Sequence, residues 1–157
     1  MAADYDSVMN LIEAHSAEIS FWPPGNGASE EWIQRAEESL GVNLPPTYKW
    51  FLREFGFGDI GHEEIYGILE EEFETAVGGD VVYNFLVRRK SGTAAQNQLV
   101  LCDNDGDEIF YFKLDSPGED GEFPVFRIDH MEGSDEPYAD DFLEFLKKRI
   151  EFLCSSV

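Results

Sequence analysis

The 157-residue sequence has few cysteines, few basic residues and no long hydrophobic run. Only Cys102 and Cys154 occur, far apart and outside a Cys-x-x-Cys spacing, so neither a disulfide scaffold nor a zinc site is expected. No apolar stretch approaches the roughly 20 residues that cross a bilayer. The first residues, MAADYDSV, are acidic where a secretory signal is basic. Together these absences favour a reducing, cytoplasmic location.

The shortage of basic residues limits the classes of partner. Eleven lysines and arginines stand against 33 acidic residues, which gives a formal net charge of −22. Recognition of phosphate needs a cationic surface, so direct binding to nucleic acid or to an anionic membrane is excluded. The negative charge either serves solubility or steers a basic partner onto an acidic surface, and the two explanations are compatible. A nuclease with a phosphate-binding groove is one such basic partner.

The sequence does contain enough apolar residues for a folded core. Hydrophobic residues make up 43% and aromatic residues 14% of the chain. This composition is typical of a globular domain and not of a disordered acidic tail. Residues 1–157 are therefore expected to form one domain with one core.

The segment from Ser29 to Gly56 predicts two amphipathic helices joined by a proline connector. Ser29 is a natural N-cap, and Gly41 is placed to end the first helix. Pro46 suits the start of the second helix, because proline lacks the N–H that would be unpaired there. The apolar faces are Ile33, Ala36 and Leu40 in the first helix and Tyr48, Phe51, Leu52 and Phe55 in the second. This unit is expected to pack, not to catalyse.

The other elements are predicted from periodicity and residue type. Helices are expected over 4–19 and 139–153, one or two strands within 57–68, and an antiparallel meander from strands 99–102, 109–114 and 123–128. Residues 80–90 are ambiguous, because they are strand-prone by residue type but carry an acid at the start and three cations at the end, as a helix dipole favours.

The central segment also resembles the signature of a known superfamily. The pattern Leu40-Gly41-x-x-Leu44-Pro45-x-x-Tyr48-x-x-Phe51-Leu52, followed by Ile65-Tyr66-Gly67-Ile68, is similar to the SUKH superfamily. That superfamily includes Smi/Knr-type fungal cell-wall regulators and small bacterial immunity proteins. The resemblance continues more loosely through residues 98–114 and the final helix.

This resemblance implies a fold and a mode of action. The implied fold is α+β: a single domain with a mostly antiparallel twisted sheet packed against several helices. It favours the helical interpretation of residues 80–90. In bacteria, the implied partner is a secreted toxin domain that the immunity protein neutralises.

Three local patterns resemble functional motifs but are better explained by structure. Residues 56–61 fit GxGxxG, yet a helix precedes them and a strand follows, the reverse of a dinucleotide site, so turn glycines are predicted. Residues 103–108 lack the glycine and glutamate positions of a calcium loop and predict a hairpin turn. His15, His62 and His130 have no metal-ligand spacing, and His15 is expected to be a partly buried packing residue. Neither a metal nor a cofactor is therefore expected.

The leading hypothesis is a cytoplasmic immunity protein that occludes a basic toxin through an acidic surface. Trp50 lies about 200° around its helix from Tyr48, which places it nearer the outward face as an aromatic anchor. The predicted partner-binding residues are Trp50, Asp59, Glu63, Glu64, Glu70, Glu71, Glu72, Asp103, Asp105 and Asp107.

Two other functions stay open. One is an intracellular scaffold or regulatory interaction module like the fungal members of the superfamily. The other is a hydrolase that uses paired carboxylates, although acidic residues are so abundant that no particular pair stands out. The expected state is a monomer or a weak dimer that pairs through an exposed strand edge.

Overall fold

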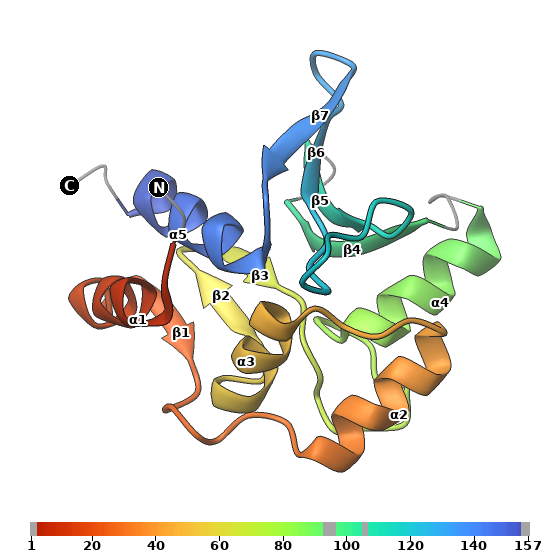
Figure 1. Ribbon diagram of the computed structural model, residues 1–157, viewed down its shortest axis with the longest axis horizontal. Helices are drawn as coiled ribbons and strands as arrows, with labels where there is room; N and C mark the ends of the chain where they lie inside the picture. The colour runs from red at the N-terminus through yellow and green to blue at the C-terminus, as the bar shows by residue number, and fades with distance from the viewer. Residues whose placement is uncertain (1–2, 93–96, 105–106, 155–157) are drawn as a thin grey trace.

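A computed structural model describes residues 3–92, 97–104 and 107–154 (Figure 1). These residues form five helices and seven strands, and the predicted α+β fold with antiparallel sheet and packed helices is confirmed. The helices are α1 Tyr5–Ala14, α2 Glu30–Leu40, α3 Pro46–Glu54, α4 Val81–Ser91 and α5 Phe142–Leu153. The strands are β1 Ile19–Phe21, β2 Gly58–Ile60, β3 Glu63–Ile65, β4 Gln98–Asp103, β5 Glu108–Lys113, β6 Val125–Asp129 and β7 Ser134–Ala139.

The strands form two antiparallel sheets, in the orders β1-β2-β3 and β4-β5-β6-β7. A backbone hydrogen bond links the two sheets just after β3: the Tyr66 N–H donates to the Leu101 carbonyl in β4 at 2.8 Å. The strand β7 was not predicted. Its sequence, SDEPYA, is polar and contains a proline, as befits a sheet edge, so it gives no hydrophobic signal.

Both terminal helices are shorter than predicted. The helix α1 ends at Ala14, and Ile19 begins β1, where it pairs with Ile60 of β2. Ile19 also falls on the apolar face of the predicted helix, so periodicity alone did not separate the two states. The helix α5 begins at Phe142 because Ala139 still pairs with Val125 in the sheet and Asp141 supplies the N-cap.

The end signals of the central helices are confirmed. The Ser29 hydroxyl accepts from the Trp32 N–H at the start of α2, and Gly41 ends that helix with φ 75°. Residues 80–90 form a helix because the Asp80 carboxylate caps its first turn, accepting from the Tyr83 N–H at 2.9 Å. Two glycines of the GxGxxG pattern serve turns, Gly56 and Gly61, with φ 78° and 63°, whereas Gly58 lies in strand β2.

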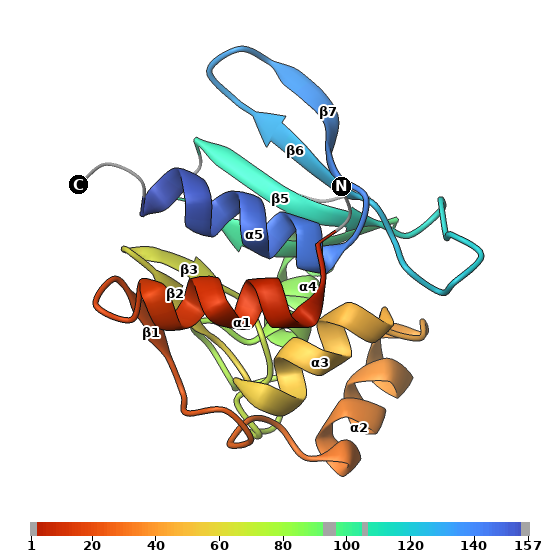
Figure 2. The ribbon, with the colours of Figure 1, turned by 60° about the vertical axis from the view of Figure 1, so that its left-hand side comes forward.

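A largely aromatic core lies between the sheets and the helices. Seven aromatic side chains are almost fully buried: Tyr48, Phe51, Phe55, Phe110, Phe112, Phe142 and Phe145. The Tyr48 hydroxyl donates to the Tyr66 carbonyl at 2.7 Å, so the one polar group of this set is paired. The helices α1 and α5 lie side by side over β1–β3, so two segments from opposite ends of the sequence are neighbours (Figure 2).

Two predicted absences concern the described residues. No helix among them is both long enough and apolar enough to cross a membrane. Cys102 and Cys154 are both buried and carry free thiols.

The predicted hairpin turn at residues 103–108 joins β4 to β5. Within it the Asn104 carboxamide oxygen accepts from the Glu108 N–H at 2.7 Å; residues 105 and 106 lie outside the described part.

Candidate functional site

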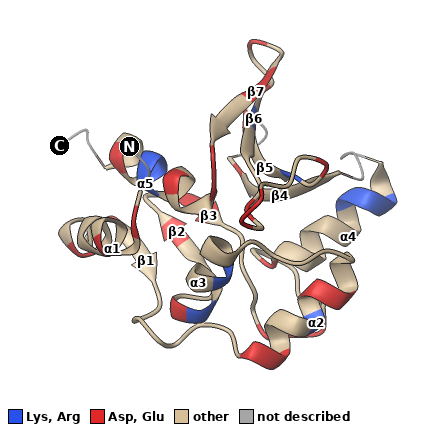
Figure 3. Cartoon of the chain, in the orientation of Figure 1, with Lys and Arg blue, Asp and Glu red and all other residues tan. Residues whose placement is uncertain are grey.

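Acidic residues are spread over most elements, whereas basic residues gather at a few places (Figure 3). The last turn of α4 carries Arg88, Arg89 and Lys90. Because charge alone marks no single face, a site has to be identified from the shape of the surface and from the pairing of the carboxylates.

Four of the predicted contact residues line one open hollow of about 510 Å³. Its walls come from the β2–β3 hairpin, the turn between β4 and β5 and the last turns of α5. We call it the acidic hollow; its lining residues are Asp59, His62, Glu63, Glu64, Asp103, Asn104, Glu108, Arg149, Phe152 and Leu153.

The floor of the acidic hollow is a buried ion pair. Glu63 is 7% exposed and Arg149 4% exposed. The Arg149 Nη2 and Nε atoms donate to Glu63 Oε2 at 2.6 and 3.2 Å, and Asn104 Nδ2 donates to Glu63 Oε1 at 3.0 Å. Both oxygens of Glu63 are thus engaged inside the protein, so this residue shapes the hollow and does not present its charge to a partner.

The environment of Arg149 keeps it charged. Burial by itself lowers the pKa of the guanidinium, but hydrogen bonds to Tyr138 and Glu63 raise it above its usual value. The guanidinium also lies over the Phe110 ring, 4.6 Å from its centroid. The floor is therefore rigid and internally neutralised.

The rim carries two carboxylates on neighbouring strands, and no lysine or arginine in the described part of the chain forms an ion pair with either. Asp59 and Glu64 are directly opposed on β2 and β3. Neither takes part in any ion pair between described residues. Partial burial, and then the charge of Asp59, raise the pKa of Glu64. A lysine or arginine from outside would relieve this repulsion.

The other acids of the hollow are engaged within the protein. Asp103 accepts from Arg88 Nη2 at 2.6 Å. Glu108 pairs with Arg127; burial raises the pKa of Glu108, but the hydrogen bonds from Arg127 and Asn104 outweigh it and hold the pKa below its usual value. Asp59 and Glu64 are accordingly the carboxylates best placed to meet a partner.

An exposed aromatic side chain stands beside these acids. Phe152, on the last turn of α5, is 67% exposed and lies 5.2 Å from the Arg149 guanidinium. Phe152 is not among the predicted contacts, because an apolar residue in an amphipathic helix is expected to pack against the core. The signal that could have identified it is its place in the last turn of the helix, beyond Ile150, the last buried residue of α5.

The remaining predicted contacts lie elsewhere. Glu70 accepts from the Ser29 N–H at 3.0 Å, and Glu72 pairs with Arg35 at 3.1 Å, so the segment that includes Glu71 lies beside α2. Asp107 is exposed in the β4–β5 turn, and Asp105 lies outside the described residues.

Trp50 does not stand free at the surface. It is half-buried, with its ring centroid 5.0 Å from Tyr5 and 5.8 Å from Phe55. The helical wheel placed Trp50 outward correctly with respect to α3 alone, but the start of α1 packs against that side.

The acidic hollow is suited to binding a cation-bearing surface. It offers two unneutralised carboxylates, an exposed phenyl ring and a fixed floor. It is open to solvent and does not enclose a small substrate, whereas catalytic pockets bury most of their ligand.

Comparison with known proteins identifies the fold and the family. The SUKH family described as SMI1-KNR4 cell-wall matches residues 30–146, about three quarters of the chain. A crystal structure of a protein from Pseudomonas syringae pv. tomato has a similar fold, with a TM-score of 0.62 and 16% sequence identity over 88% of this chain and 95% of that chain. The family match covers both hairpin walls of the acidic hollow but stops before Arg149 and Phe152. This chain belongs to the SUKH superfamily.

Proposed function

We propose that this protein is a cytoplasmic immunity protein, which binds a cognate basic toxin domain and neutralises it by occlusion. Membership of the SUKH superfamily and the net charge of −22 both support binding to a cationic protein surface. The observation that carries the proposal is the acidic hollow, where Asp59 and Glu64 occupy opposed positions on β2 and β3 and form no ion pair with any other described residue.

The physical role of each group follows from its surroundings. The surplus of negative charge speeds the encounter with a basic partner, because long-range attraction raises the association rate. At contact, a lysine or arginine of the toxin enters between Asp59 and Glu64. Phe152 supplies apolar contact area beside it, which slows dissociation. Covering the cationic cleft of the toxin then excludes its substrate.

Co-expression with the toxin domain encoded beside this protein tests the proposal. The wild-type protein should restore growth and form a one-to-one complex at low salt. The double variant Asp59→Asn/Glu64→Gln should weaken the complex by about 10-fold or more, since each lost charge contact is worth roughly 1 kcal/mol or above. The matched control is Glu31→Gln/Glu38→Gln, which removes the same charge from exposed positions on α2.

Salt separates the electrostatic part of the mechanism from the rest. The association rate constant should fall steeply between low and physiological ionic strength, because screening shortens the range of attraction to about 8 Å. A complete absence of complex with the neighbouring toxin would refute the proposal. A complex whose association rate ignores salt would remove only the steering role of the acidic surface.

A second candidate is a regulatory interaction module, which the cell-wall description of the matching family favours. In that case several endogenous proteins, and no single toxin, should bind the purified chain. Quantitative pull-down with wild type and the Asp59→Asn/Glu64→Gln variant distinguishes the two functions.

A further inference from the structure

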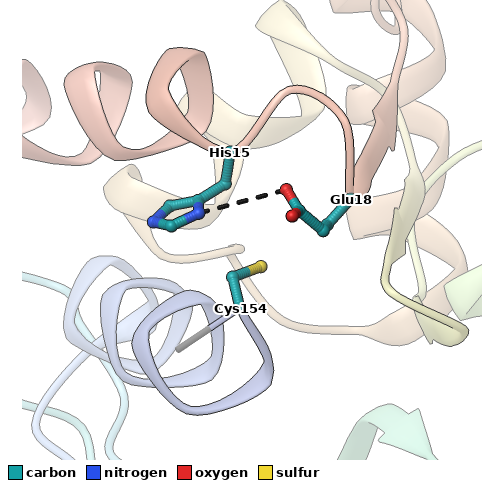
Figure 4. A group of neighbouring side chains, drawn as sticks. All are labelled: His15, Glu18 and Cys154. Carbon is teal, nitrogen blue, oxygen red and sulfur yellow. Dashed lines mark ion pairs between the residues drawn. The ribbon is translucent and has the colours of Figure 1, made fainter. Parts of the chain in front are cut away.

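Three side chains from opposite ends of the sequence meet at the edge of the α1–α5 pair (Figure 4). They are His15 at the end of α1, Glu18 in the turn before β1, and Cys154 directly after α5. One ligand atom from each lies within 4.8 Å of the others, and His15 Nδ1 is 4.0 Å from Glu18 Oε2.

We propose that His15, Glu18 and Cys154 bind a zinc ion. An imidazole nitrogen, a thiolate and a carboxylate are the three ligand types that zinc takes in proteins. With zinc–ligand distances of roughly 2.0 to 2.3 Å, the ligand atoms of a tetrahedral site are about 3.4 to 3.6 Å apart. The three atoms therefore have to move inward by about 1 Å, which rotation of the Glu18 and Cys154 side chains provides. A water molecule takes the fourth position.

The backbone holds these ligands in place without the metal. The His15 carbonyl accepts from the N–H groups of Glu18 and Ile19 at 2.9 and 3.1 Å, which fixes the turn between α1 and β1. The Glu18 carbonyl accepts from the Gly61 N–H at 2.6 Å, which ties this turn to the β2–β3 hairpin. The Cys154 N–H donates to the Ile150 carbonyl at 2.9 Å. A preformed site loses little conformational entropy when the ion binds.

Burial and charge also suit a zinc ion. Cys154 is 3% exposed, whereas the His15 and Glu18 side chains are 29% and 39% exposed, so an ion enters from the solvent side and meets the sulfur at the base. Zinc binding replaces the thiol proton, which passes to solvent water, and the thiolate and carboxylate then balance the charge of the ion.

The thiolate argues against the hard cations that a carboxylate-rich protein attracts. Calcium and magnesium take oxygen ligands, whereas thiolate and imidazole select zinc and its neighbours in the transition series. The prediction of no zinc site rested on sequence spacing, and Cys154 is brought to His15 only by the packing of α1 on α5.

A bound ion would join the first helix to the end of the last one. All three residues lie outside residues 30–146, so the match to the SUKH family does not by itself imply this site. It also adjoins the last turn of α5, which carries Phe152 and Leu153 at the rim of the acidic hollow. Zinc therefore stabilises the rim on which an aromatic contact stands.

Titration of the reduced, metal-free, full-length protein with zinc and with cobalt tests the site. We expect one ion per chain by calorimetry and a near-ultraviolet thiolate-to-cobalt charge-transfer band that zinc abolishes. The melting temperature should rise by about 5 to 10 °C when zinc exceeds its dissociation constant 100-fold.

Substitutions assign the ligands. Cys154→Ser should abolish the charge-transfer band, and His15→Gln or Glu18→Gln should weaken zinc binding by at least roughly tenfold. The control is His130→Gln, an exposed histidine outside both the cluster and the acidic hollow, which should bind zinc as the wild type does. Melting in a chelator checks that each variant is folded, and Glu18→Gln, at the most exposed ligand, preserves the test if Cys154→Ser is unstable. A lack of stoichiometric binding would overturn the proposal, as would a cobalt band that survives Cys154→Ser in folded protein.

Discussion

Removal of Arg149 is expected to be the most damaging single change of charge in this protein. The substitution Arg149→Met keeps most of the aliphatic volume but leaves the Glu63 carboxylate, which is 7% exposed, without its cation. Only the hydrogen bond from Asn104 then remains among the Glu63 contacts described above. Loss of one partner of a buried ion pair costs about 3 to 5 kcal/mol, most of it from the buried charge left behind.

Urea unfolding measures this cost directly. At about 2 to 4 °C per kcal/mol for a chain of this size, the melting temperature should fall by roughly 6 to 20 °C. The double variant Glu63→Gln/Arg149→Met should recover much of the loss, because neither charge is then buried alone. The control Arg53→Met breaks an exposed pair with Glu30, whose side chains are 47% and 69% exposed, and should cost about 1 kcal/mol or less.

Two outcomes would refute this reasoning. If Arg149→Met costs no more than Arg53→Met, the pair does not hold the floor of the hollow. If the double variant is as unstable as Arg149→Met alone, the loss comes from packing around the guanidinium, which lies over Phe110, and not from the charge.

Three further changes test other parts of the structure. Tyr48→Phe removes the hydroxyl that donates to the Tyr66 carbonyl at 2.7 Å inside the core and should cost about 1 to 3 kcal/mol in urea unfolding; an unchanged midpoint would contradict this pairing. Gly67→Ala should cost well over about 3 kcal/mol or prevent folding, because the added carbon would lie 1.7 Å from the Gly56 carbonyl oxygen. In the control Gly41→Ala the added carbon meets open space, so this variant should lose only about 1 kcal/mol of stability, because of its positive φ. Equal losses of stability in the two variants would refute the close approach of Gly67 to Gly56. Burial raises the pKa of Glu122, in spite of its hydrogen bonds with Thr47, above the ordinary 4.5. The folded state then binds this proton more tightly than the unfolded chain, so the contribution of Glu122 to stability is fully present below 4.5 and declines as pH rises through the raised pKa. Glu122→Gln should remove that decline in urea unfolding measured from about pH 4 to about pH 7, and a pH profile identical to wild type would exclude the effect.

Local end signals in the sequence predicted the central helices well. Ser29, Gly41 and Pro46 act through their own backbone and side-chain chemistry, so their roles need no distant partner. The ambiguity at residues 80–90 was also settled by a local feature, the cap formed by Asp80 on the Tyr83 N–H. The strands β4 and β5 of the meander were also predicted, because their apolar residues are neighbours in the sequence.

The terminal regions were predicted less accurately because their structure depends on pairing with remote strands. Ile19 is compatible with a helix face and with a strand, and its pairing with Ile60 decides for β1. The polar strand β7 exists because β6 presents unpaired backbone groups to it. No apolar pattern in residues 134–139 announces that pairing.

The candidate site, too, was predicted only in part from the sequence. The family signature was in the sequence and predicted the SUKH fold, and the net charge is the basis for the prediction of a basic partner. Which carboxylates meet was decided by the tertiary structure: it set Asp59 opposite Glu64 and enclosed Glu63 with Arg149. It also carried Cys154 to His15 across nearly the whole chain. The reason is that caps, turns and charge are properties of neighbouring residues, whereas side-chain pairing across elements exists only after the chain has packed.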